Sequence, residues 1–187
     1  MLETISPSQF LRMIDAGVLG EDEDRAELLE GVICLRDRQT PPHATTLHRS
    51  AEALRKWLPP SWHVRVRATV TTSESVVDTD LAVIRGPFTR YDDRHPTPAD
   101  TALIVEVADS SLARDRGLKL RIYARAAIPA YWIVNLIDHV VEVHTVPTGP
   151  APTPTYGETR VVKLEESLSM TIAGHAITIP ASELFSG

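Results

Sequence analysis

An apolar run from Ala102 to Val107 constrains the fold of this chain most, because it carries one carboxylate, Glu106. The run is too short for a helix and rich in β-branched residues, which predicts a strand covered on both faces. An ionised carboxylate without a partner is costly in such a strand, so Glu106 indicates a nearby cation or metal ion. Lys119, in the basic helical segment that follows, is the candidate cation.

A second strand-like stretch, residues 76–84, carries the carboxylates of Asp78 and Asp80. Two acidic strands followed by a helical lysine form the one constellation in the sequence that suggests chemistry. Each member also has a structural interpretation. Asp78 and Asp80 could cap a turn or lie at an exposed strand end. Glu106 could form a structural ion pair with Lys119 or an arginine. Lys119 alone could be a solvated, partly exposed helix residue.

The composition suits one globular domain spanning residues 1–187, because 43% of these residues are hydrophobic and can form a core. The net charge of −6 argues against tight non-specific binding of nucleic acid but leaves a local basic cleft open. The single cysteine, Cys34, excludes an intrachain disulfide. No apolar run approaches the roughly 18 residues of a membrane span, and the first ten residues lack signal-peptide features. We therefore expect a cytoplasmic protein without a membrane partner.

Periodicity and turn residues divide the chain into short elements. Ser6, followed three residues later by Gln9, predicts the capping box of a helix that ends near Gly17. A hairpin of two short strands then meets at Glu30 and Gly31. The later elements are a helix at about 42–58, strands at 63–71, 76–84, 102–107 and 130–135, a helix at 112–126, and a C-terminal β meander. We expect these four strands to form one mixed sheet, in which the crossover helix makes the last two parallel.

The order of these elements, with carboxylates on the second and third strands, resembles that of the PD-(D/E)XK nuclease superfamily. The resemblance is strongest to its Uma2-like (DUF820) family of restriction endonucleases, and it spans most of the chain. The most specific string is LIVEVADSSLARDRGLKLRIYARAAIPAYWIVN at 103–135; shorter ones are AELLEG at 26–31, PPHAT at 41–45, DLAVIRG at 80–86 and the closing ELF. The resemblance implies an α/β, restriction-endonuclease-like fold. Its mixed central sheet would be flanked by helices, with an N-terminal helix and hairpin and a C-terminal β meander.

The resemblance also implies a site and a reaction. Asp80 and Glu106 match the acidic motif positions, which would make both of them catalytic metal ligands, and Lys119 matches the catalytic lysine. The implied cofactor is Mg²⁺ or Mn²⁺, and the implied partner is DNA. The sequence leaves the oligomeric state open, with a homodimer as one alternative.

Three positions depart from the pattern. Ala108 stands in the strand where the superfamily commonly has its lysine, so the resemblance places that lysine on the following helix. Thr79 stands where proline is common, a change without consequence because proline does no chemistry. In the hairpin, Val32 stands where the family commonly has glutamate, which leaves Glu27 as the only matched carboxylate there.

Further candidates come from the two central helices. Asp115, Lys119 and Tyr123 follow at i, i+4 spacing, so one helix face could present all three toward the strand ends. Asp115 could instead form a helix-face ion pair, and Tyr123 could lie in the core with its hydroxyl at the cleft edge. His43 could contact phosphate, or be a capping or surface residue. Its spacing to His48, without a cysteine cluster, argues against zinc.

Arginines provide a candidate DNA-facing surface. Arg65 and Arg67 lie on one side of an alternating strand and could join Arg114, Arg116, Arg121 and Arg125. Our leading hypothesis is a metal-dependent endonuclease hydrolysing DNA phosphodiester bonds, in which carboxylate-held metal activates water and the lysine stabilises charge on phosphate. The alternative is a non-catalytic nuclease-fold binding or regulatory module. A third class, a metal-dependent hydrolase of a small phosphorylated substrate, would need a closed pocket.

Overall fold

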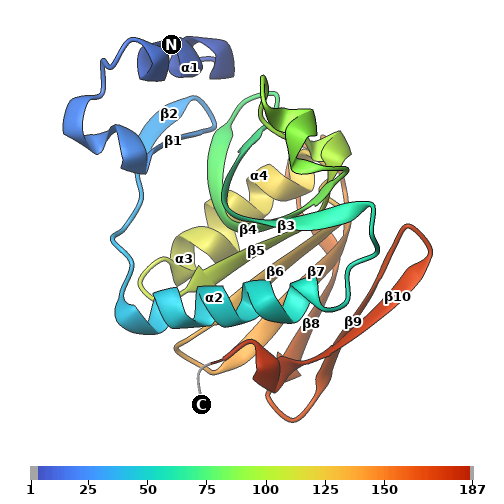
Figure 1. Ribbon diagram of the computed structural model, residues 1–187. Coiled ribbons are helices and arrows are strands. Elements are labelled where there is room, and N and C mark those ends of the chain that lie inside the picture. Colours follow the sequence, from blue (N-terminus) through green and yellow to red (C-terminus); the bar gives the residue numbers. More distant parts are fainter. Residues whose placement is uncertain (1–3, 186–187) are drawn as a thin grey trace.

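The computed structural model of the protein describes residues 4–185. Within these residues, eight strands form one mixed sheet in the order β2-β1-β4-β5-β6-β7-β8, and β3 pairs with β4 beside this path (Figure 1). The strands are β1 (Ala26–Leu29), β2 (Val32–Leu35), β3 (Trp62–Thr71), β4 (Val76–Arg85), β5 (Thr101–Ala108), β6 (Ala130–Asn135), β7 (Val140–Pro147) and β8 (Tyr156–Lys163). The prediction of one mixed sheet is confirmed.

The central pair of strands, β5 and β6, is parallel, as the crossover helix between them predicts. The first turn of this crossover helix is α3 (Leu112–Arg114), its middle is a π-helical turn (Asp115–Lys119), and its last part is α4 (Leu120–Arg125). Every residue of β5 and β6 is buried, which agrees with their almost continuous apolar sequences.

Helices cover both faces of the sheet (Figure 1). On one face, α2 (Pro41–Arg55) packs Leu47 and Leu54 against Leu81 and Val105 of the sheet. On the other face, Tyr123 of the crossover helix belongs to a second core cluster with apolar residues of β5 and β6. Side chains along β5 point alternately toward these two layers, so the side chain of Glu106 lies on the face of the sheet that α4 covers.

The N-terminal elements form as predicted. α1 (Pro7–Asp15) starts with a capping box, in which the amide of Gln9 donates to Ser6 Oγ and the amide of Ser6 donates to Gln9 Oε1. The β1–β2 hairpin is antiparallel, and β1 reaches the rest of the sheet through the pairing of Leu28 with Val76. Phe10 of α1 packs against this hairpin, which closes a small third layer.

The C-terminal meander is divided between two sheets. β8 extends the main sheet at its edge, whereas β9 (Ser167–Ile172) and β10 (His175–Pro180) pair only with each other among the described residues. Their inward residues Leu168 and Ile177 are buried in the core cluster of α2. The hairpin therefore completes the layer that α2 begins (Figure 1).

Candidate active site where the β4–β5 ladder ends

Asp80 and Glu106 meet at the point where the backbone pairing of β4 and β5 stops. The last paired residues there are Leu81 and Val105. Beyond them, the amide of Asp80 donates to Glu106 Oε2 at 3.3 Å, and the amide of Val107 donates to Asp80 Oδ2 at 2.9 Å. The two carboxylates thus replace backbone carbonyls as acceptors, which places them side by side between the strands.

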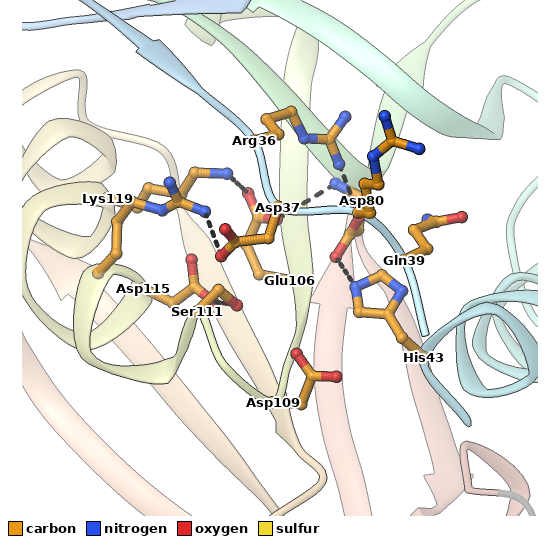
Figure 2. Close-up of a pocket in the computed structure, with 12 residues that line it drawn as sticks. Arg36, Asp37, Gln39, His43, Asp80, Glu106, Asp109, Ser111, Asp115 and Lys119 are labelled. Carbon is orange, nitrogen blue, oxygen red and sulfur yellow. Dashed lines mark hydrogen bonds and ion pairs between the residues drawn. The ribbon is translucent and has the colours of Figure 1, made fainter. Parts of the chain in front are cut away.

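Glu106 is buried and accepts two further hydrogen bonds on Oε1. Lys119 Nζ lies 3.0 Å away, and the hydroxyl of Tyr123 donates at 2.6 Å (Figure 2 shows the lysine contact). Loss of hydration raises the pKa of Glu106 to about 7, because the attraction of Lys119 does not fully offset burial and the nearby charge of Asp80.

Asp80 is held by two cationic side chains as well as by the backbone. Arg36 Nη2 lies 3.0 Å from Oδ1, and His43 Nε2 lies 3.1 Å from Oδ2 (Figure 2). Burial would raise the pKa of Asp80, but the hydrogen bond and charge of His43, with Lys119 and Arg36, hold it below its ordinary value. Asp80 is therefore ionised, and its charge is balanced on both oxygens.

Lys119 is only 2% exposed, which contradicts the expectation of a partly exposed helix residue. Its ammonium lies 3.0 Å from Glu106, 3.6 Å from Glu27 and 3.5 Å from the carbonyl oxygen of Asp78. Burial alone would lower the pKa of Lys119, but the surrounding carboxylates outweigh burial and raise it. The lysine is therefore a fixed positive charge inside the protein.

The buried lysine is the last residue of a π-helical turn. This turn replaces one turn of the regular α-helix that the sequence predicts, so that the amide of Leu120 donates to the carbonyl of Asp115, five residues back. The same carbonyl accepts a hydrogen bond from the hydroxyl of Tyr131 at 3.2 Å. Asp115, Lys119 and Tyr123 are all buried on the side that faces the sheet. The sequence expectation that one face presents these three residues is thus met by a widened helix.

The accessory candidates lie in the same cluster, in different roles. Glu27 is fully buried beside Lys119, and within residues 4–185 neither of its carboxylate oxygens has a hydrogen-bond partner. Asp115 accepts a hydrogen bond from Ser111 Oγ at 2.6 Å. His43 is neither the cap of α2 nor a surface residue: Thr40 is the cap, and the His43 ring is directed at Asp80.

Carboxylates outnumber cations in this cluster. Burial would lower the pKa of His43, but its hydrogen bond to Asp80 and the charges of the carboxylates around it raise that pKa. The carboxylates raise the pKa of Lys119, whereas burial is the main cause of the raised pKa of Glu106 and the charge of Asp80 adds to it. The carboxylates are Glu27, Asp78, Asp80, Glu106 and Asp115, and the cations are Arg36, His43 and Lys119. Such an arrangement favours the arrival of a further cation.

The donor chemistry fits a hard divalent cation. Asp80 and Glu106 offer adjacent carboxylate oxygens, each of which retains unused acceptor capacity, and a cavity of about 30 Å³ lies beside them (Figure 2). Within residues 4–185, no group of three or more His, Cys, Asp or Glu side chains is arranged to hold a metal ion. These two carboxylates would therefore need main-chain or water oxygens to complete a coordination shell, as Mg²⁺ commonly has.

Sequence reasoning missed Arg36, the nearest cation to Asp80. It also overestimated the free positive charge of the helix after β5, because these arginines are paired with acidic residues. The pairs are Arg114 with Asp37, Arg116 with Glu142, Arg121 with Glu30 and Arg125 with Glu30. The ion pairs of Arg121 and Arg125 with Glu30 connect the β1–β2 turn to α4. Arg65 lies over the rings of Phe88 and Tyr91, with its guanidinium carbon 5.4 and 5.0 Å from their centroids.

Comparison with known proteins identifies the family. The sequence model of Uma2, described as "Putative restriction endonuclease", matches residues 7–179. The chain belongs to the Uma2 family. The fold is similar to that of the structure titled "Crystal structure of a putative nuclease belonging to DUF820 from Anabaena variabilis ATCC 29413 at 1.96 A resolution". That chain is 14% identical, with a TM-score of 0.69 and 97% of each chain covered. A search of curated proteins gave no match. In residues 4–185, every helix is too short or too polar to span a bilayer.

Proposed function

We propose that this Uma2 family member is a metal-dependent endonuclease that hydrolyses DNA phosphodiester bonds. The observation that carries the proposal is the buried cluster of Asp80, Glu106 and Lys119 at the end of the β4–β5 ladder. A structural core has no need of two adjacent carboxylates between strands, since apolar residues would be at least as stable there. The family description supports the same reaction class. DNA as the partner, a cytoplasmic location and a homodimeric assembly belong to this proposal.

In this proposal Asp80 and Glu106 hold Mg²⁺ or Mn²⁺, which would supply water activation and charge neutralisation at phosphate. Tyr123 fixes the orientation of Glu106 through its hydroxyl, and the amide of Val107 fixes that of Asp80. Lys119 keeps its proton and is held by Glu106, so its charge stays beside the reacting phosphate without moving. Glu27 holds the other side of the lysine and is a positioning residue.

The alternative of a non-catalytic binding or regulatory module has one specific observation in its favour. Each oxygen of Asp80 already contacts a basic side chain, Arg36 or His43, so the charge of Asp80 itself has partners without a metal ion. A hydrolase of small phosphorylated substrates is less well supported, because the cavity of about 30 Å³ is far below the roughly 300 Å³ of small-molecule pockets.

Plasmid cleavage tests the proposal against the non-catalytic alternative. Wild-type protein should nick supercoiled DNA at low salt with Mg²⁺ or Mn²⁺ and not with EDTA. Asp80→Asn and Glu106→Gln should each lose at least about 10²-fold in rate, the loss expected for a single electrostatic group in an active site. Glu52→Gln is the matched control, because Glu52 is an exposed carboxylate of α2. Cleavage that persists in both site variants would assign the activity to another site or to a contaminant.

A further inference from the structure

The segment between β2 and α2, residues 36–40, runs along the mouth of the candidate site; we call it the 36–40 strap. Its residues Arg36, Asp37, Arg38 and Gln39 line the cavity with the two carboxylates (Figure 2). Side-chain contacts fasten the strap to residues around the site. Arg36 contacts Asp80, Arg114 Nη2 donates to Asp37 Oδ2 at 3.4 Å, and Thr40 Oγ1 donates to Asp109 Oδ2 at 2.9 Å.

Arg36 makes the tightest of these contacts with the site itself. Its side chain is buried, with Nη2 3.0 Å from Asp80 Oδ1 and Nη1 4.0 Å from Asp78 Oδ2. Its backbone is held from the opposite side, because the carbonyl accepts hydrogen bonds from Arg25 Nε at 3.0 Å and Nη2 at 2.6 Å. The guanidinium therefore reaches into the site from a fixed base, and its side-chain torsions are the means by which it can leave.

A divalent cation bound to Asp80 and the guanidinium of Arg36 would be close neighbours with like charge. An arginine cannot relieve this repulsion by losing a proton. Repulsion at such short range inside a protein is large compared with the binding energy of one weak metal ligand. Asp78 offers an alternative acceptor, since its carboxylate is 22% exposed and already 4.0 Å from Arg36 Nη1.

We propose that Arg36 competes with the divalent metal for Asp80, so that metal binding displaces Arg36 toward Asp78 and loosens the 36–40 strap. This inference rests on the proposed function, because it concerns regulation of the same site. The strap would then control access to the site. While Arg36 contacts Asp80, the cavity of about 30 Å³ admits little more than a water molecule, and a phosphodiester requires a wider opening. Displaced Arg36 stays at that mouth, where a planar guanidinium suits two phosphate oxygens.

Metal affinity measured by calorimetry with MnCl₂ alone tests the competition. Arg36→Gln should bind Mn²⁺ about tenfold more tightly than wild type, the order expected when one charge-assisted hydrogen bond no longer has to be broken. Arg36→Lys, which keeps the charge, should stay near the wild-type affinity. Arg49→Gln is the matched control, because Arg49 is an exposed arginine of α2 that does not line the cavity. Equal affinities for Arg36→Gln and Arg49→Gln, or weaker binding by Arg36→Gln, would overturn the proposal.

Limited trypsin digestion of the wild-type chain gives a second measurement that needs no variant at Arg36. Mn²⁺ should increase the rate of cleavage after Arg38, and Asp80→Asn should show no such increase. Protection of the strap by Mn²⁺ would also overturn the proposal. The calorimetry separates this inference from the proposed function. Unchanged Mn²⁺ binding in both Asp80→Asn and Glu106→Gln would rule out the proposed metal site itself. Loss of Mn²⁺ binding in those two variants, with no effect of Arg36→Gln, would rule out only the competition by Arg36.

Discussion

Replacement of Lys119 with methionine removes a buried charge while keeping most of the side-chain volume. The lysine is 2% exposed and is the partner of Glu106 at 3.0 Å and of Glu27 at 3.6 Å. Without it, neither carboxylate has an ion-pair partner of comparable proximity in the described part of the chain. Loss of one partner from a buried ion pair destabilises proteins by about 3–5 kcal/mol, which we expect for Lys119→Met. For a domain of this size that corresponds to a fall in Tm of roughly 6–20 °C.

The pH dependence of this loss identifies its cause. Glu106 can escape the penalty by binding a proton, and its pKa rises further when the lysine is removed. The destabilisation should therefore be larger at pH 8 than at pH 5.5, measured by urea denaturation at both values. Lys56→Ala is the control: Lys56 lies 3.0 Å from Glu183 but is 62% exposed, so its removal should cost about 1 kcal/mol or less. A loss below about 1 kcal/mol for Lys119→Met, or one independent of pH, would refute the reasoning.

Two further predictions concern the groups around Glu106. Tyr123→Phe removes the hydroxyl that donates to Glu106 Oε1 at 2.6 Å and should cost about 1.5–3 kcal/mol in urea denaturation. Tyr156→Phe should cost less, about 0.5–1.5 kcal/mol, because its hydroxyl donates to the neutral carbonyl of Ile128; equal losses would contradict the charge-assisted interpretation. For Glu106, whose pKa is raised from 4.5 to about 7, the contribution to stability is complete below pH 4.5 and is lost as pH rises through 7. Wild-type stability should therefore decline relative to Glu106→Gln between pH 5 and pH 8, and a relative increase would show that the pKa is lowered instead.

Much of the sheet could be predicted because its strands are locally encoded. Residues 102–107 and 130–135 are almost continuous apolar runs joined by a segment of helical length, and this pattern predicts a parallel pair covered on both faces. The acidic positions followed from the same reasoning, since a carboxylate in a buried strand must meet a polar partner. Glu106 forms the expected ion pair with Lys119, and its role as a metal ligand stays a prediction.

The rest of the site depends on contacts that no local spacing encodes. Arg36 and Asp80 are 44 positions apart, and Arg36 follows an exposed strand end that gives no sign of burial. The arginines of α4 look like a free basic face, yet Arg121 and Arg125 reach Glu30, 91 and 95 positions away. Lys119 alone looks solvated because lysine is rarely buried without a partner. The carboxylates that surround it, which come from other elements of the fold, explain its burial.

The location of bound Mn²⁺ in crystals of the wild-type protein tests the central claim most directly. Anomalous diffraction from crystals grown with MnCl₂ should show a metal ion bound to carboxylate oxygens of both Asp80 and Glu106, with Lys119 still paired to Glu106. Manganese bound only elsewhere, or no anomalous peak at saturating MnCl₂ with Asp80 and Glu106 arranged as here, would contradict the claim that this cluster is a metal-dependent active site.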